Sequence, residues 1–110
     1  MKKYFILYKA TPEQFKKWMS MSEGEGKKWM EAFNAWMTPY KSSFVDEGGP
    51  LNKVKKVTKG KVEDINNDIG AYAVVQAESL EAAADIFKDS PHFEGDSWIE
   101  VMEMPGWKSN

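Results

Sequence analysis

The sequence predicts an α+β domain of the ferredoxin-like type, a βαββαβ sandwich in which the helices cover one face of an antiparallel sheet. Three observations predict it. Side chains alternate with a period of two near both ends of the chain and again over residues 71–77. Apolar residues recur at helical spacing between these stretches, and a lysine-rich segment with a Lys59–Gly60 turn lies in the middle. The length of 110 residues suits one domain, spanning residues 1–110.

The first strand is expected over residues 3–9, where two sets alternate: Tyr4, Ile6 and Tyr8 against Phe5 and Leu7. A helix is expected to begin after Thr11, because Pro12 at the first helical position lacks an amide that would be unpaired anyway. A second, longer helix is expected from about residue 22, with an aromatic face made of Trp29, Phe33, Trp36, Tyr40 and Phe44. Pro39 should kink or split that helix.

Residues 54–58 and 61–65 flank the Lys59–Gly60 turn, which predicts a short hairpin, and the lysines there fit the edge of a sheet. The next strand covers residues 71–77. Ser79 is placed to cap the helix that follows, and this helix must stop before Pro91. Alternation returns over residues 98–104 as the last strand.

The two faces of the predicted sheet differ. The set expected to face the helices is Phe5, Leu7, Ala73, Val75, Ile99 and Val101. The set expected on the open face is Tyr4, Ile6, Tyr8, Tyr72, Val74, Gln76, Trp98, Glu100 and Met102. Such a face is too apolar for an isolated protomer in water, which predicts a homodimer joined through it. Alternatively, a loop or the kinked helix covers these residues as ordinary core, and a register error of one residue would exchange the faces.

Composition excludes several classes of protein. The chain has no cysteine, so a disulfide framework, a thiolate metal site and a cysteine nucleophile are impossible. No apolar run reaches the roughly 18 residues of a membrane span. No membrane association is therefore expected, and a cytoplasmic location is the default. All 15 basic residues are lysines, which removes the bidentate arginine groups that often recognise phosphate and carboxylate.

The segment GAYAVVQAESLEAAADIFKDSPHFEGDSWIEVMEM, residues 70–104, resembles the C-terminal half of the YCII-related family. In that family a Gly-Gly-Tyr strand, a Ser-Leu-Glu-Ala-Ala helix, a Cys-Pro-His-Leu corner and a Val-Glu-Val strand follow one another. The N-terminal strand, the tryptophan-rich helix and the Glu-Gly-Gly-Pro-Leu segment at 47–51 agree with its first half. The resemblance spans residues 1 to about 104 and implies a dimeric α/β-barrel whose members are suspected enzymes with a histidine and aspartate pair.

Carried onto this chain, the resemblance assigns the corner histidine to His92 and makes Asp68 the candidate acidic partner. The chain departs from the family at two places. It has Asn-Asp-Ile-Gly at 67–70 where many relatives carry Asp-Gly-Pro-Phe, and residues 27–31 lack the histidine that another branch places on its first long helix. The catalytic candidates are therefore His92 and Asp68.

His92 is the one histidine of the chain, and two interpretations stay open for it. An imidazole with an ordinary pKa near 6.5 is suited to general acid or base catalysis, with Glu100 or Asp68 orienting its ring. Alternatively, its ring caps the last carbonyls of the preceding helix. One histidine and scattered carboxylates supply no cluster with zinc or iron spacing, so neither a metal site nor another cofactor is expected.

The candidate binding residues line the cavity expected between two sheets: Tyr8, Tyr72, Gln76, Trp98 and Glu100. They predict a site for a small apolar or aromatic organic molecule. The tryptophans at 18, 29 and 36 fit either core packing or ligand contact. Enzyme and non-catalytic ligand-binding or accessory module both remain open. A third interpretation, single-stranded RNA stacked on the tyrosines, is disfavoured by the absence of arginine and the net charge of −2.

Overall fold

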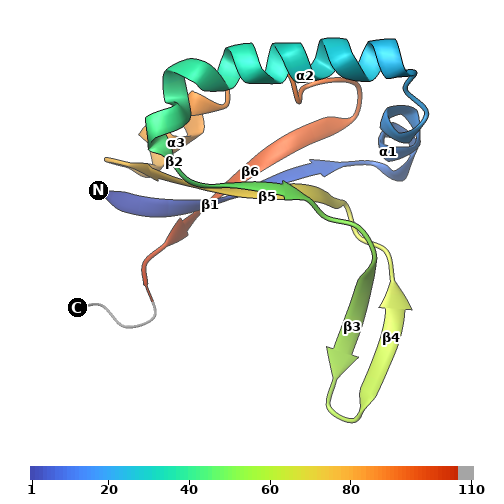
Figure 1. The fold of residues 1–110 in the computed structure, drawn as a ribbon. Helices are drawn as coiled ribbons and strands as arrows, with labels where there is room; N and C mark the ends of the chain where they lie inside the picture. The colour runs from blue at the N-terminus through green and yellow to red at the C-terminus, as the bar shows by residue number, and fades with distance from the viewer. Residues whose placement is uncertain (107–110) are drawn as a thin grey trace.

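The computed structural model describes residues 1–106, so residues 107–110 of the predicted domain lie outside the described part. The elements follow in the order β1 (Lys2–Ala10), α1 (Pro12–Met19), α2 (Glu23–Met37), the 3₁₀ helix η1 (Thr38–Ser43), β2 (Phe44–Pro50), β3 (Val54–Thr58), β4 (Lys61–Ile65), β5 (Ile69–Ala77), α3 (Leu80–Ile86) and β6 (Ser97–Met104). Figure 1 shows the helices on one side of the sheet and the β3–β4 hairpin projecting from one end of it.

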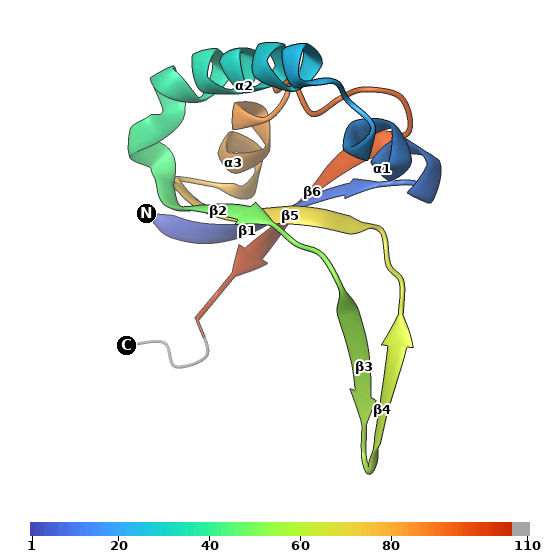
Figure 2. The same cartoon turned by 45° about the vertical axis from the view of Figure 1, so that its right-hand side comes forward.

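The main sheet has the strand order β2-β5-β1-β6, and each neighbouring pair is antiparallel. With the hairpin set aside, this is the order of a ferredoxin-like βαββαβ fold, and the turned view in Figure 2 again places α1, α2 and α3 on the same face. The predicted fold class is confirmed.

Short polar side chains fix where the helices begin. Thr11 accepts a hydrogen bond from the amide of Gln14 at the start of α1, and Ser79 accepts one from the amide of Ala82 at the start of α3. Ser22 and Glu25 form a reciprocal capping box for α2. Helix α2 ends at Met37 and continues as η1, as expected from Pro39.

One expectation about the strands is wrong. The β3–β4 hairpin has the predicted bounds, but it forms a separate two-stranded sheet and is not the edge strand of the main one. The edge strands are β2 and β6, and β2 begins at Phe44, a residue expected on the second helix. The 3₁₀ segment after Pro39 reverses the chain early enough for residues 44–50 to pair with β5.

The faces expected for β1 are also wrong. Tyr4 and Ile6 are only 1% and 0% exposed and belong to the helix-side core with Tyr8 packed against it, whereas Phe5 and Leu7 are half-buried. Cross-strand pairing gives the reason. Ile6 lies opposite Ala73 and Tyr8 opposite Ala71, so small side chains on β5 leave room for large ones on β1. The assignments of β5 and β6 are confirmed: Ala73 and Val75 are buried in the core and Ile99 and Val101 pack against it.

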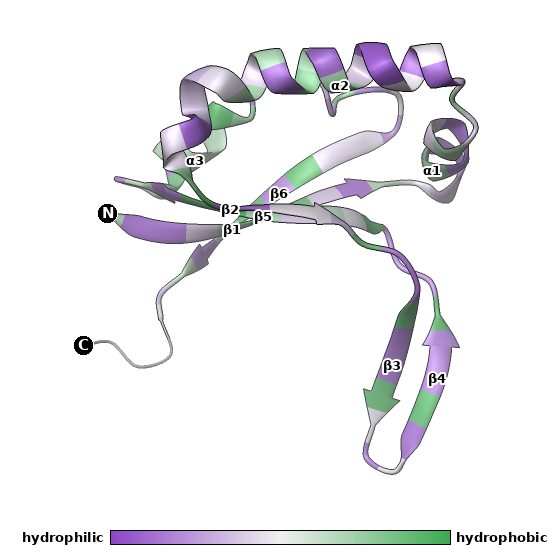
Figure 3. Ribbon diagram, in the orientation of Figure 1, coloured by the Kyte–Doolittle hydropathy of each residue, from purple (hydrophilic) through white to green (hydrophobic). Residues whose placement is uncertain are grey.

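The open face and the hairpin expose apolar side chains. With β1 corrected, the open face carries Phe5, Leu7, Tyr72, Val74, Trp98 and Met102, and Phe5 stacks on Tyr72 at 6.0 Å. Figure 3 shows hydrophobic segments along the projecting hairpin, where Val57 and Val62 are 72% and 62% exposed. The radius of gyration of 15.6 Å exceeds the roughly 13 Å typical of this length, because the hairpin projects. No helix among residues 1–106 is long and apolar enough to cross a membrane.

Candidate functional site

The corner between α3 and β6 carries His92 and is held by short hydrogen bonds. The hydroxyl of Ser97 donates to the carbonyl oxygen of His92 at 2.7 Å and accepts from the amide of Glu94 at 3.0 Å. The amide of Thr11 donates to the carbonyl of Asp96 at 3.0 Å, which ties the corner to the start of α1. The backbone at His92 is therefore fixed from both sides.

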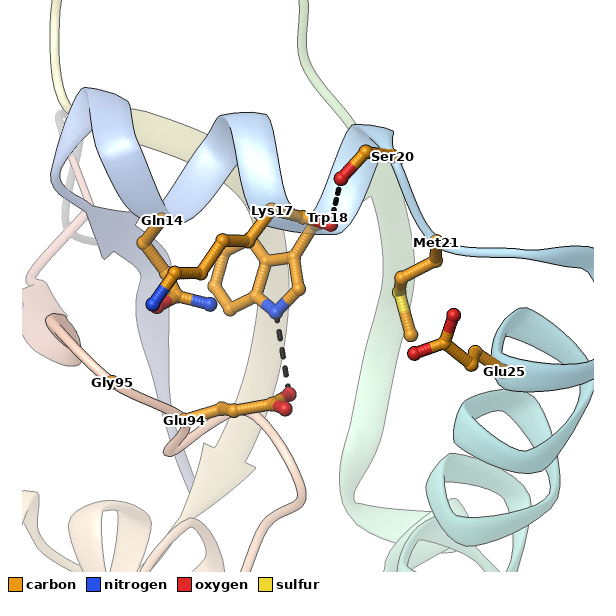
Figure 4. A pocket seen from close by; sticks show the side chains of 8 residues that line it. All are labelled: Gln14, Lys17, Trp18, Ser20, Met21, Glu25, Glu94 and Gly95. Atoms are coloured by element: carbon orange, nitrogen blue, oxygen red, sulfur yellow. Dashed lines mark hydrogen bonds between the residues drawn. The ribbon is translucent and has the colours of Figure 1, made fainter.

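A small polar pocket of about 370 Å³ shows how α1 fastens the same corner (Figure 4). The indole nitrogen of Trp18 donates to the carboxylate of Glu94 at 3.4 Å. Gln14 is buried. In the amide orientation that satisfies both its nitrogen and its oxygen, the nitrogen donates to the carbonyl of Glu94 and the oxygen accepts from the indole of Trp18. Gly95 has φ +62° and faces Gln14 so closely that a Cβ would lie 2.1 Å from Oε1. These contacts join α1 to the corner that carries His92.

Four aromatic rings surround the imidazole of His92. Tyr8 stacks on it with ring centres 4.1 Å apart, and three rings stand nearly perpendicular to it: Trp29 at 5.3 Å, Phe33 at 5.5 Å and Trp36 at 5.8 Å. Burial lowers the pKa of His92 from 6.5 to about 4, because the charged form would lose its hydration. Burial also raises the pKa of Tyr8 above its ordinary value. Both side chains are therefore neutral at pH 7.

The imidazole has one hydrogen-bond partner among the described residues, and it is neither of the expected carboxylates. Nδ1 lies 3.0 Å from the hydroxyl oxygen of Ser90, a residue that is only 6% exposed. The ring does not cap α3, whose last carbonyls accept from the backbone amides of Phe87 and Lys88 and from the indole nitrogen of Trp36. The capping interpretation of His92 is thus wrong.

Asp68 and Glu100 lie elsewhere, in a charged cluster around Lys9. The ammonium of Lys9 is 3.1 Å from Asp68 and 3.3 Å from Glu100, and it lies 5.9 Å from the ring centre of Trp98. The hydrogen bond to Asp68, with a smaller contribution from Glu100, raises the pKa of Lys9. Hydrogen bonds from Trp98 and Lys9 lower the pKa of Glu100. The structure therefore gives both carboxylates an ion-pairing role on the open face.

The other expected binding residues are divided between the two faces. Tyr8 lies on the helix side against His92. Tyr72 and Gln76 lie on the open face, where the hydroxyl of Tyr72 donates to Asp46 at 3.3 Å and the amide of Gln76 donates to the carbonyl of Ser42 at 3.5 Å. The structure does not bring Gln76 and Glu100 together with His92 at the larger pocket, which both His92 and Trp98 line.

This larger pocket has a volume of about 1110 Å³ and lies at the end of the sheet where β1 ends and β5 and β6 begin. Its walls come from α1, α2 and the base of the hairpin. The aromatic side chains that line it are Tyr8, Phe15, Trp18, Trp29, Phe33, Tyr72, His92 and Trp98, so three of the expected binding residues, Tyr8, Tyr72 and Trp98, meet His92 there. The indole nitrogen of Trp29 is the one buried side-chain N or O atom without a hydrogen-bond partner among residues 1–106. Sequence reasoning missed Phe33 and Ser90 as site residues and left Trp29 undecided. The aromatic spacing on α2 was the available signal.

Within residues 1–106 no three His, Cys, Asp or Glu side chains are grouped closely enough to hold a metal ion. The larger pocket offers aromatic surfaces, one neutral imidazole and the charged side chains of Lys9, Lys16, Glu47 and Lys53.

No protein-family model and no curated protein matches the sequence. Among solved structures, the chain is similar over nearly its whole length to the 5-chloro-2-hydroxyhydroquinone dehydrochlorinase TftG of Burkholderia phenoliruptrix AC1100, in complex with 2,5-dihydroxybenzoquinone. The TM-score is 0.54 at 18% identity, covering 98% of this chain and 95% of the other. The likeness shows the fold. TftG has the YCII-like form of the dimeric α/β-barrel fold, which agrees with the resemblance at the level of architecture.

Proposed function

We propose that this protein binds a small oxygenated aromatic molecule in the pocket beside His92 and acts on it with His92 as general acid or base, within the YCII-related family. One observation carries the proposal: the one histidine of the chain stands among four aromatic rings at the wall of a pocket of about 1110 Å³. Pockets of this size, apolar with a few polar groups, are typical of small-molecule sites.

The geometry favours a flat ring as the ligand. Tyr8, Trp29 and Phe33 offer ring faces and edges within contact distance of the imidazole, and aromatic pairs stabilise such contacts beyond simple burial. The ligand named for TftG, 2,5-dihydroxybenzoquinone, belongs to this chemical class and supports the choice. An anionic ligand oxygen next to the imidazole would raise the pKa of His92 toward neutrality, where proton transfer is most efficient.

Homodimerisation through the open face is part of the proposal. After the correction of β1, this face still presents Phe5, Leu7, Tyr72, Val74 and Met102, and Met102 is 48% exposed. A second copy would cover this apolar surface and also the exposed valines of the hairpin. A single domain over residues 1–110 and a cytoplasmic location complete the proposal.

Binding can be measured by isothermal titration calorimetry with 2,5-dihydroxybenzoquinone as the probe. The unmodified protein should bind it, and His92→Ala and Phe33→Ala should weaken binding by about tenfold or more, since each removes part of the ring wall. Lys88→Ala is the matched control, because Lys88 is exposed, pairs with Asp85 and lies outside the pocket. Equal affinity in the His92 variant and the unmodified protein would refute the site.

Turnover separates an enzyme from a binding module. If the protein is an enzyme, the consumption of a hydroxylated quinone or phenol should follow a pH profile that His92→Gln abolishes, while the affinity changes much less. A binding or accessory module would show the affinity change alone.

A further inference from the structure

The hydroxyl of Ser90 has a limited choice of hydrogen-bond partners. Its oxygen accepts from the backbone amide of His92 at 3.3 Å and lies 3.0 Å from Nδ1 of the same residue. No other acceptor for its proton is found in the part of the chain that the structure describes, and Ser90 is buried. A buried hydroxyl that does not donate is unfavourable, so the hydroxyl of Ser90 donates its hydrogen bond to Nδ1.

This choice decides where the imidazole carries its own proton. A neutral histidine has one nitrogen that donates and one that accepts. If Nδ1 accepts from Ser90, Nε2 must carry the hydrogen. In the other tautomer Nδ1 would donate to Ser90, which would leave the hydroxyl proton of Ser90 without a partner.

Nε2 is free to meet a ligand. It has no hydrogen bond to residues 1–106. Among these residues the indole nitrogen of Trp29 is the one side-chain N or O atom that is both buried and without a partner, so Nε2, which also has no partner, is not buried. Nε2 is therefore accessible at the pocket that His92 lines. The neutral phenol of Tyr8 adds an O–H to the same wall, whereas the indole N–H of Trp29 is buried.

We propose that Ser90 is a positioning residue that holds His92 in its Nε2–H tautomer, so that the aromatic part of the pocket presents hydrogen-bond donors and selects ligands with an accepting carbonyl or phenolate oxygen. The choice of ligand rests on the function proposed above, whereas the tautomer does not. In this arrangement the neutral ring donates a hydrogen bond from Nε2 to a ligand oxygen, and transfer of a proton to the ligand requires His92 to be protonated first.

The tautomer can be read directly, because the chain has one histidine and its ring nitrogens give uncrowded spectra. Long-range ¹H–¹⁵N correlation at pH 7 on the ligand-free protein should show Nε2 protonated and Nδ1 unprotonated. Ser90→Ala should produce a mixture of tautomers, and Ser90→Thr, which keeps the hydroxyl, should restore the original pattern. A protonated Nδ1 in the unmodified protein, or a Ser90→Ala spectrum identical to it, would overturn the proposal.

The ligand preference has a separate test. 2,5-Dihydroxybenzoquinone should bind at least about tenfold more tightly than p-xylene, a ring of similar width without oxygen, and Tyr8→Phe should reduce this preference by about threefold to tenfold. Equal affinity for both probes would overturn the proposal that the pocket selects ligands by donating hydrogen bonds, but it would not affect the assignment of the His92 tautomer. If neither probe binds although Nε2 is protonated, the proposed function fails and the role of Ser90 in positioning the ring stands.

Discussion

The helix-facing side of the sheet and its open side carry the same kinds of apolar side chain, but these side chains form the core on one side and a partly exposed surface on the other. On the helix side Tyr4, Ile6 and Tyr8 are packed under helices, and Tyr8 in turn supports His92. On the open side Phe5 and Leu7 alternate with them along the same strand but remain half-buried. The difference shows that the apolar character of a strand does not reveal which side forms the site. The packing of its neighbours does.

The largest effect should separate two adjacent residues of β1. Ile6→Ala leaves a cavity in the core, because Ile6 is 0% exposed, and should lower the free energy of unfolding by about 2–5 kcal/mol. Leu7→Ala, one residue further along on the open face, should cost roughly 1 kcal/mol in an isolated protomer. Urea unfolding at several protein concentrations measures both. Equal losses independent of concentration would contradict the assignment of faces.

A pH dependence should report on the burial of His92. Its pKa falls from 6.5 to about 4 on folding, so between these values the unfolded chain binds the proton more readily than the folded one. The contribution of His92 to the free energy of unfolding is at its maximum above about pH 6.5. It decreases by about 3 kcal/mol in all as the pH falls toward 4. The difference in unfolding free energy between the unmodified protein and His92→Gln should follow this curve, since the carboxylates are common to both. A difference that is flat over this range would show that the imidazole is hydrated.

A charge on the open face should act on association more than on folding. Phe5→Asp places a carboxylate beside Tyr72 in the surface that we propose joins two copies, and the dimer should weaken by tenfold or more. Sedimentation velocity over a range of concentrations measures it, with Lys88→Asp as the control on the far side of the fold. If the unmodified protein stays a single protomer at high concentration, the proposed dimer is wrong.

The smallest effect is expected in the hairpin. Val57→Thr and Val62→Thr alter a cross-strand pair that is largely exposed in the protomer, so each should change the free energy of unfolding by less than about 0.5 kcal/mol. If the free energy of unfolding decreases by more than this, and only at concentrations where dimers form, the hairpin packs against a second copy. A large loss at every concentration would mean that these valines pack within the protomer.

The sequence predicts the fold class, the hairpin and the caps because each depends on local patterns: alternation, a Lys59–Gly60 turn, or Ser79 before an apolar helix. The faces of β1 depend on volumes across strands, where Ala71 and Ala73 accept Tyr8 and Ile6, and alternation alone is symmetric between the two sides. Pairing the small residues of one predicted strand with the large ones of another would have indicated the correct side.

The site was predicted in part for the same reason. His92 stands out as the one histidine of the chain, but its surroundings come from α2 and β1, which are remote in sequence. Asp68 was placed beside it by resemblance, and the structure instead pairs Asp68 with Lys9. Ser90 lies two residues from His92, but in the sequence a serine before a proline indicates only the end of a helix. Its hydrogen bond with the imidazole becomes visible in the structure, where the ring of His92 turns back toward Ser90.

The Lys59–Gly60 turn between β3 and β4 lies at the far tip of the projecting hairpin, and since Gly60 has φ +78° an attachment there belongs on Lys59. A short peptide epitope or a fluorophore attached at this tip should leave the pocket and the sheet untouched. The tip of the hairpin is thus a convenient point for attaching the protein to a surface, because the pocket lies at the base of the hairpin and not at its tip.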